Sequence, residues 1–282
     1  MIGQVKISDR EKQYGLLSNK GIYQVKPSVT GLLNDYTGAA AAYSLALLYD
    51  DYTGNCVTVR RASDNATLDI GFSNNELDTA SLEAFCSGTD GYVTTWFDQS
   101  GNGANATQTT AANQPQIVSS GSVILENGKL AMYYDGTISK SLNVSSFGTT
   151  LTQPNTYFTV ANKNDISGFL FDGISGQRNT QSGNNIFAGT SLADAYPISN
   201  ENTQVLFTAL FDGASSQGFI NGSNTATGDT DTRGVEGLRI GNKFTQDDAF
   251  EGTLQSFVFY NSDQSANQRG IETALNDYYN IF

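Results

Sequence analysis

The segment TTWFDQSGNGANATQ, residues 94–108, carries side chains of the types that bind metal ions. Asp98, Ser100 and Asn102, followed by a glycine, match the first half of a D-x-S-x-N-G calcium loop, in which oxygen atoms at alternate positions hold the cation. A complete loop ends in a bidentate glutamate at its twelfth position, and that position here is Thr109. The segment therefore offers an incomplete calcium site.

The same segment can instead be a structural turn. Gly101 and Gly103 allow the positive φ angles of a tight turn, and Asp98 and Asn102 can bond to their own backbone. Trp96, the only tryptophan, ends a run that alternates like a strand, so its ring is expected in the core. We favour this scaffold interpretation over the calcium site.

Other common catalytic centres are excluded by composition. Histidine is absent, which rules out His-based triads, His metal ligands and His general bases. The two cysteines, Cys56 and Cys86, are too few for a four-cysteine zinc site. They could form one disulfide, but two buried free thiols are expected after synthesis in a cytoplasm.

The charge of the chain is negative and unevenly distributed. Its 282 residues have a net charge of −13 and a pI near 4.2, so binding to nucleic acid is not expected. Residues 1–30 nevertheless carry +3, against −16 for the rest. We predict that this N-terminal arm docks on a particle, although a frayed terminus would look the same. Its basic residues are Lys6, Arg10, Lys12, Lys20 and Lys26.

The first residues, MIGQVKISDREKQYG, lack the apolar core of a signal peptide. No apolar run is as long as a membrane span. We therefore expect synthesis in a host cytoplasm, with release by lysis or as part of a particle.

Local patterns predict three helices and many short strands. Helices are expected over 38–54, over 77–88 with Asp78 as N-cap, and after Ser262 or Asp263 near the C-terminus. Strands are expected over 55–63 and 91–97. From about residue 115 short apolar runs alternate with turn residues. These runs are 121–136, 155–163, 204–213, 217–223, 237–243 and 251–262.

This spacing is typical of an all-β sandwich or jelly roll. Asn-Gly pairs in LENGKL and FINGSN predict hairpin turns. We expect an N-terminal arm over 1–30 and one concanavalin-A-like β-sandwich domain with a few short helices over 31–282. Within VRRASDN, Arg60 and Arg61 point to opposite faces of a strand. One is expected to be solvated and the other to pair inward with Asp64 or Asp69.

Three segments occur along this chain in the same order as similar segments in one enzyme family. They are AYSLALLYDDYTGNCVTVRRASDNATLDIGF, LDTASLEAFCSG and VTTWFDQSGNGANATQ. Together, over about residues 42–115, they resemble the catalytic domain of fungal α-L-arabinofuranosidase B, a glycoside hydrolase with a β-sandwich fold. The second half resembles the concanavalin-A-like, laminin-G-like modules of phage tail and capsid appendages. The two resemblances imply the same fold and different chemistry.

The resemblance also implies which positions would carry catalysis. A retaining glycosidase needs two carboxyl groups about 5 Å apart, one as nucleophile and one as acid/base. Alignment of SGNNIFAG and RIGNKFTQDDAFEG with the family places Gly183 and Lys243 at these two positions. An adjacent pair of cysteines in the family corresponds to Phe169 and Leu170. Glycine offers no nucleophile and lysine is a poor acid at its ordinary pKa, so the family's mechanism is not expected to operate.

Three acidic residues follow Lys243 closely, namely Asp247, Asp248 and Glu251. They could form a relocated catalytic pair, or they could contribute to a glycan-binding face.

These observations favour a non-catalytic virion protein, such as a bacteriophage capsid decoration, fibre or tail appendage with a lectin-like sandwich. It would contact other virion proteins and host-surface glycans at the virion surface, as a homo-oligomer, without a cofactor. The alternatives are a glycoside hydrolase of the α-L-arabinofuranosidase type and a free carbohydrate-binding module.

Overall fold

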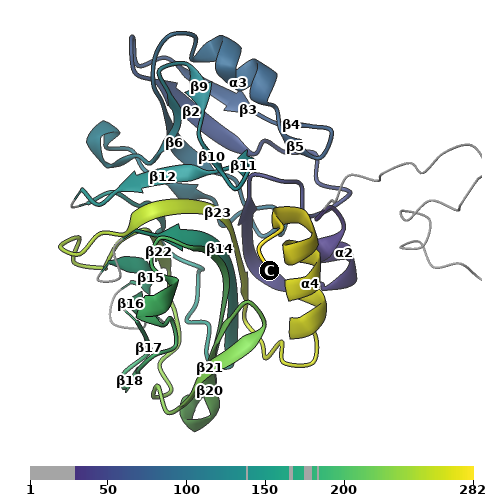
Figure 1. Ribbon diagram of the computed structural model, residues 1–282, viewed down its shortest axis with the longest axis vertical. Coiled ribbons are helices and arrows are strands. Elements are labelled where there is room, and N and C mark those ends of the chain that lie inside the picture. The colour runs from purple at the N-terminus through teal and green to yellow at the C-terminus, as the bar shows by residue number, and fades with distance from the viewer. Residues whose placement is uncertain (1–28, 138, 165–167, 175–179, 183) are drawn as a thin grey trace, which may run out of the picture.

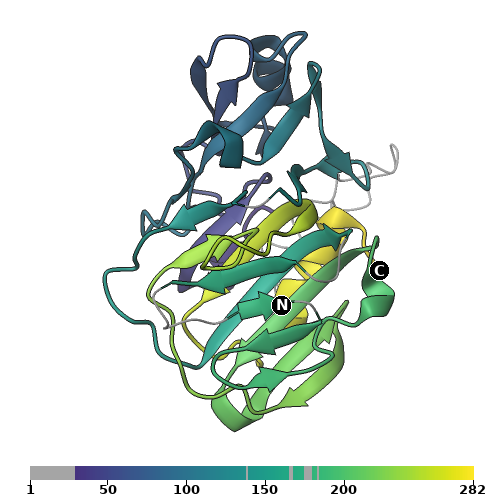
Figure 2. The ribbon, with the colours of Figure 1, turned by 90° about the vertical axis from the view of Figure 1, so that its left-hand side faces the viewer.

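A computed structural model describes residues 29–282, except 138, 165–167, 175–179 and 183. Figure 1 shows a β-sandwich with one long helix against its side, and Figure 2 shows a smaller lobe above the sandwich. The fold is all-β with a few short helices, as predicted. In the part of the chain that the structure describes, no helix is long and apolar enough to cross a membrane.

The first sheet of the sandwich is antiparallel throughout, and each of its strands pairs with the next in space. In spatial order the strands are β1 (Ala39–Ser44), β23 (Glu251–Tyr260), β14 (Asn155–Lys163), β19 (Gln204–Phe211), β20 (Ser216–Ile220) and β21 (Ser223–Gly228). The three longest, β14, β19 and β23, match runs that the sequence predicted. The Asn-Gly turn between β20 and β21 is also confirmed, with φ of 52° and 76° at Asn221 and Gly222.

The second sheet lies across the core from the first and consists of shorter strands. In spatial order they are β7 (Ala106–Thr107), β13 (Leu142–Val144), β22 (Leu238–Ile240), β15 (Phe169–Gly173), β16 (Thr180–Ser182), β17 (Asn185–Phe187) and β18 (Ser191–Leu192). This sheet carries the positions that the sequence singled out as candidate site residues.

The smaller lobe continues from the sandwich through strand pairing. Its strands are β3 (Thr67–Ile70), β2 (Val57–Arg61), β6 (Gly91–Trp96), β8 (Gln116–Ser119) and β9 (Ser122–Val123), covered by α3 (Thr79–Phe85). β6 also pairs with β7, and β12 (Met132–Asp135) joins β8 to β23. Asp78 caps α3 as predicted, because its carboxylate accepts the backbone N–H of Ser81 at 3.2 Å.

Two small hairpins and two further helices complete the regular structure. The hairpins pair β4 (Phe72–Ser73) with β5 (Glu76–Leu77), and β10 (Leu125–Glu126) with β11 (Lys129–Leu130). The helices are α2 (Leu32–Asp35) and α4 (Gln268–Tyr279), and single 3₁₀ turns span 111–113, 198–200 and 213–215.

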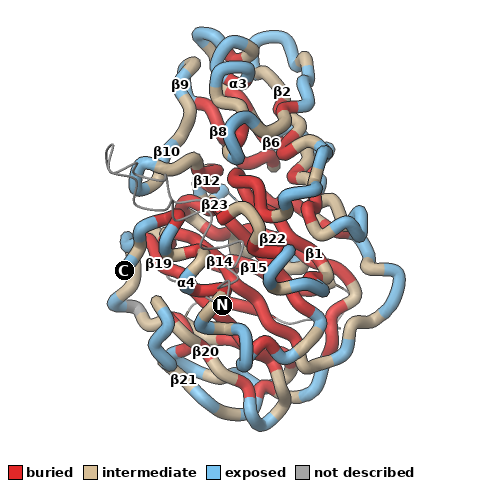
Figure 3. Tube along the Cα trace, turned by 90° about the vertical axis from the view of Figure 1, so that its right-hand side faces the viewer, coloured by how far each residue is buried: buried red, intermediate tan, exposed pale blue. Residues whose placement is uncertain are grey.

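Four strands of the first sheet, β1, β23, β14 and β19, are buried on both faces, whereas β21 at the far edge is not. Figure 3 shows the buried strands side by side in red. Tyr157 and Phe259 face the second sheet and stack with ring centroids 4.5 Å apart. Their neighbours Phe158 and Val258 face the other way and pack under α4. α4 covers this face with the apolar side chains predicted from its periodicity, Ile271, Leu275 and Tyr278.

Two predictions about helices were wrong. Residues 38–54 are not helical; they contain β1 and a long connection. Ala39 and Ala42 pack tightly under α4 while Ala41 and Tyr43 face the opposite core, so pairing with β23 overrides the helix propensity of alanine. The last helix begins after Asn267 rather than at Ser262 or Asp263. The Asp263 carboxylate instead accepts the backbone N–H of Ser265 in a turn.

α4 also brings one carboxyl group into the core. Glu272 is 5% exposed and accepts hydrogen bonds from the Thr208 hydroxyl at 2.7 Å and the Gln268 amide at 2.9 Å. Burial raises the pKa of this carboxyl above its ordinary value, against the smaller opposing effect of the two hydrogen bonds.

We therefore expect stability to fall as pH rises through the pKa of Glu272. The folded state binds the proton more tightly than the unfolded state, so ionisation between the ordinary value of 4.5 and the raised pKa costs stability. Glu272→Gln should flatten this fall and raise the urea midpoint at pH 7, with the exposed Glu83→Gln as control. Equal pH profiles for wild type and Glu272→Gln would contradict the assignment.

Candidate functional site

The positions implicated by the family resemblance lie where β15, β16 and β22 meet the segment after β22. We call this region the β15–β22 site and define it by Phe169, Asp172, Gln181, Arg239, Lys243 and Asp247. β15 lies between β16 and β22, so Phe171 is opposite both Gln181 and Ile240, and Asp172 is opposite Arg239. Gly168 lets the chain cross closely here, because a Cβ would collide with the carbonyl oxygen of Ala249.

Asp172 ties the following segment to the sheet. It is fully buried, and its carboxylate accepts the backbone N–H groups of Gly173 and Phe244, each at 2.8 Å, and the Thr180 hydroxyl. These donors come from three separate parts of the chain. Asp172 thus fixes the backbone that carries Lys243 and Asp247.

A buried lysine supports the other side of the site. Lys163, at the end of β14, is fully buried, and its ammonium donates to the carbonyl of Gly168 at 2.9 Å and to the Gln181 side chain at 3.4 Å. It also lies 5.2 Å from the ring centroid of Tyr196. These groups solvate the charge of the buried ammonium. The same contacts hold Gln181 and the Gly168 turn in position.

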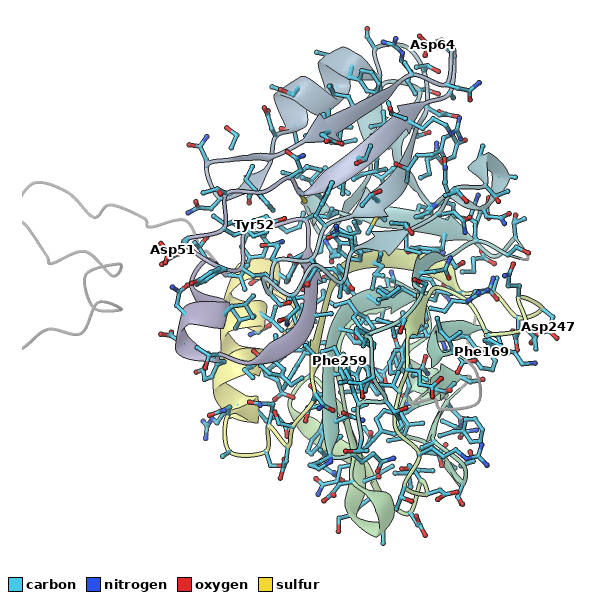
Figure 4. All side chains as sticks on the ribbon, turned by 180° about the vertical axis from the view of Figure 1, so that it is seen from behind. Asp51, Tyr52, Asp64, Phe169, Asp247 and Phe259 are labelled. Carbon is cyan, nitrogen blue, oxygen red and sulfur yellow. The ribbon has the colours of Figure 1, made fainter. Side chains whose placement is uncertain are left out.

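Lys243 and Asp247 form an ion pair at the rim of the site. Their N···O distance is 3.0 Å, and the Lys243 ammonium lies 5.7 Å from the ring centroid of Phe169. Figure 4 shows Phe169 and Asp247 close together at one edge of the molecule, with Asp247 pointing outward. Hydrogen bonds from Thr245 and Lys243 lower the pKa of the Asp247 carboxyl, so it is ionised at neutral pH.

The remaining candidates of this region are dispersed. The backbone carbonyl of Asp248 accepts the N–H of Lys243 at 3.3 Å. Glu251 begins β23 opposite Asp135, with its side chain against Gly136. Leu170 is fully buried in the core, whereas Gly183 lies outside the described residues. Of the three acidic candidates, only Asp247 has its side chain in contact with Lys243 among the described contacts.

The loop after Trp96 uses its polar side chains to hold β1. The two Asp98 carboxylate oxygens accept the backbone N–H groups of Ala42 at 2.8 Å, Ser100 at 2.9 Å and Ala104 at 3.1 Å, and the Ser100 hydroxyl at 2.8 Å. The Asn102 amide donates to the carbonyl of Ala39 at 2.9 Å. Gly101 and Gly103 have φ of 88° and 72°, as the turn interpretation requires.

The calcium interpretation of this loop receives no support. The carboxylate of Asp98 is 4% exposed and already accepts four hydrogen bonds, and Ser100 and Asn102 act as donors. No group of three or more His, Cys, Asp or Glu side chains in the described ranges could hold a metal ion. The hydrogen bonds of Asp98 agree with the scaffold interpretation, and Trp96 is fully buried beside the loop, 5.6 Å from the Tyr43 ring.

Other predictions of side-chain roles are confirmed for the two cysteines and in part for the two arginines. Cys56 and Cys86 are buried free thiols, and burial raises the pKa of both. Arg61 pairs with Asp64 at 2.6 Å, in a partly exposed position rather than an inward one. Arg60 instead binds Gln114 at 2.7 Å and Asn65 at 3.0 Å.

The basic residues of the arm lie outside the described residues. These are Lys6, Arg10, Lys12, Lys20 and Lys26. The docking role of the arm therefore stays a prediction.

Four site residues were missed from the sequence, namely Lys163, Asp172, Gln181 and Arg239. Asp172 and Arg239 had a detectable signal, because each is a charged residue within a short apolar strand, FLFDG and GLRIG. Lys163 and Gln181 had none, since their contact joins β14 to β16 across the fold.

Part of this chain is similar in sequence to known proteins. A family model for the catalytic region of α-L-arabinofuranosidase B matches residues 34–129. An α-L-arabinofuranosidase of Hypocrea jecorina is 40% identical over 74 residues, and a probable α-L-arabinofuranosidase B of Aspergillus fumigatus is 39% identical over 75. Each match covers 26% of this chain and 15% of the relative.

Solved structures extend the likeness to the whole sandwich. A GH54 α-L-arabinofuranosidase soaked with a cyclic sulfate inhibitor has a TM-score of 0.70 at 15% identity, over 89% of this chain and 65% of that one. An arabinofuranosidase complexed with arabinofuranosyl-α-1,2-xylobiose has a TM-score of 0.68 at 18% identity, over 88% and 65%.

This chain resembles the catalytic domain of α-L-arabinofuranosidase B. The sequence likeness is confined to the first half, whereas the fold is shared over most of the chain. At these identities the structural likeness establishes the fold and leaves the chemistry open. The matched stretch spans about 15% of the sequence relatives' length. The virion interpretation receives no support from these relatives.

We expect Asp98→Ala to destabilise the protein by about 3–5 kcal/mol, because it leaves several buried backbone N–H groups without an acceptor. Urea unfolding monitored by Trp96 fluorescence measures the change, and the exposed Asp51→Ala is the control. Calcium and a chelator should leave the melting temperature of the wild type unchanged. A stabilising effect of calcium that disappears in Asp98→Ala would restore the metal-loop interpretation.

Proposed function

We propose that this protein binds a glycan at the β15–β22 site and does not hydrolyse it. The observation that carries the proposal is the ion pair between Lys243 and Asp247. In the sequence interpretation Lys243 takes the position of the family's acid/base carboxyl, and the carboxylate that pairs with it, Asp247, is ionised at neutral pH. The arabinofuranosidase-like sandwich supports a carbohydrate ligand, and the altered residues argue against bond cleavage.

The composition of the site suits sugar binding. Carbohydrate and other small-molecule sites combine an aromatic surface with a few convergent polar groups. Here the Phe169 ring adjoins the Lys243 ammonium, and the buried Asp172 anchors the segment that carries Lys243. This anchoring holds the Lys243 segment in place, which lowers the entropic cost of binding.

The described carboxylates are poorly placed for a retaining mechanism, which needs a proton donor and a free nucleophile about 5 Å apart. The Asp172 carboxylate accepts three hydrogen bonds that position the backbone. Asp247 is ionised at neutral pH and projects to solvent, with 60% of its side chain exposed. Neither matches an acid held protonated by burial.

Hydrolysis of arabinofuranosyl side chains is the second candidate. The family-model match and the shared fold favour it. Incubation with arabinoxylan and a chromogenic arabinofuranoside should release no arabinose. Release of arabinose by wild type that is lost in Asp247→Asn or Asp248→Asn would establish hydrolysis instead.

Binding is tested by calorimetry after a glycan-array screen, using the strongest array ligand. Lys243→Met keeps the aliphatic stem and removes the charge, so we expect at least a threefold loss of affinity with the fold unchanged. Lys129→Met, which breaks a comparable ion pair with Glu76 at 3.2 Å, is the matched control and should bind normally. Equal losses in the two variants, or no ligand on the array, would refute the proposed site.

Display of this glycan-binding sandwich on a virion is a separate proposal, supported by the basic arm of the sequence alone. Mass spectrometry of gradient-purified particles should detect this chain at fixed stoichiometry. Deletion of residues 1–26 should then leave a folded body that no longer attaches to the particle.

A further inference from the structure

Arg239 is a buried cation, and two of its three guanidinium nitrogens have no hydrogen-bond partner among the described residues. It is 9% exposed, and its Nε and Nη1 atoms are sealed from water without accepting groups. Its flanking residues Leu238 and Ile240 belong to the core, so its side chain leaves β22 on the opposite face. A buried guanidinium normally has several hydrogen-bonded partners, because its desolvation is costly.

The side chains beside Arg239 do not meet this need. Asp172 lies opposite it on β15 and acts on it electrostatically, but no ion pair within 4.0 Å joins them among the described contacts. The Asp172 carboxylate is engaged by Gly173, Thr180 and Phe244. The guanidinium therefore keeps donors for a further acceptor.

An unfilled acceptor lies on the other side. Asn143 is opposite Arg239 on β13, and its Oδ1 is buried without a donor. Its amide nitrogen makes only a long contact of 3.4 Å to the carbonyl of Thr107. Two unpartnered donor atoms of Arg239 on β22 and the unpartnered Oδ1 of Asn143 on the neighbouring β13 thus lie close together without bonding to each other.

We propose that Arg239 binds the carboxylate of an acidic sugar, and that the glycan recognised at the β15–β22 site contains uronic acid residues. This inference rests on the glycan-binding function proposed above. A carboxylate oxygen can accept a charge-assisted hydrogen bond from the guanidinium, and a hydroxyl of the same sugar ring can donate to Asn143 Oδ1. A simple inorganic anion would satisfy the arginine alone.

The competing explanation is that Arg239 only offsets the charge of Asp172. In that case its removal would lower stability without changing which glycans bind. Ligand selectivity therefore separates the two roles, whereas stability alone does not.

The test compares matched ligands by calorimetry at low ionic strength. The probes are oligosaccharides containing galacturonate or glucuronate, each with its carboxyl-reduced counterpart of the same linkage. We expect wild type to prefer an acidic form at least tenfold. Arg239→Gln should lose about tenfold to a hundredfold in affinity for that form, with little change for the neutral one. Arg269 lies at an exposed position of α4. Arg269→Gln removes the same charge there and should bind like wild type.

A measurement on wild type alone guards against a misfolded variant. Free galacturonate should raise the melting temperature more than equimolar galactose does. The role of Arg239 would be overturned if wild type bound the acidic and the carboxyl-reduced oligosaccharides equally. It would also be overturned if folded Arg239→Gln kept the full preference for the acidic form. Glycan binding itself would stand in both cases. Binding of neither class, together with an empty glycan array, would overturn both proposals.

Discussion

Burial of β1, β23, β14 and β19 on both faces is the constraint on which the rest of the structure depends. β14 is hydrogen-bonded on both edges, to β19 and β23, and all but one of its nine residues are buried. Such a sheet needs two covers. The second sheet forms one of them, and α4 with α2 forms the other.

This constraint explains the unusual use of polar residues elsewhere. β1 extends the first sheet on the edge of β23, and its small side chains lie under α4. The Asp98 carboxylate accepts the backbone N–H of Ala42 and so holds β1 in place. The sequence that resembles a calcium loop therefore acts as a clamp on β1. This clamp lies within residues 34–129, the stretch that the arabinofuranosidase family model matches.

The candidate site occupies the outer face of the second sheet, where the architecture is less demanding. Its short strands leave polar positions facing away from the core, at Asn143, Arg239 and Asp172. Asp172 is used to hold the backbone, whereas Arg239 and Asn143 Oδ1 remain unsatisfied. This difference between neighbouring residues on one face is why we assign binding to Arg239 and support to Asp172.

The sequence by itself determined the structural features that depend only on residues close together in the chain. Alternation and length predicted β14, β19 and β23, Asp78 predicted the start of α3, and Asn221 with Gly222 predicted a hairpin. The family resemblance was also readable from the sequence. Only the tertiary structure decided the state of residues 38–54, because pairing with β23, more than 200 residues away, outweighs alanine's helix propensity. It alone brought Arg239 beside Asn143 and Asp172, since contacts across strands depend on register, which no local pattern encodes.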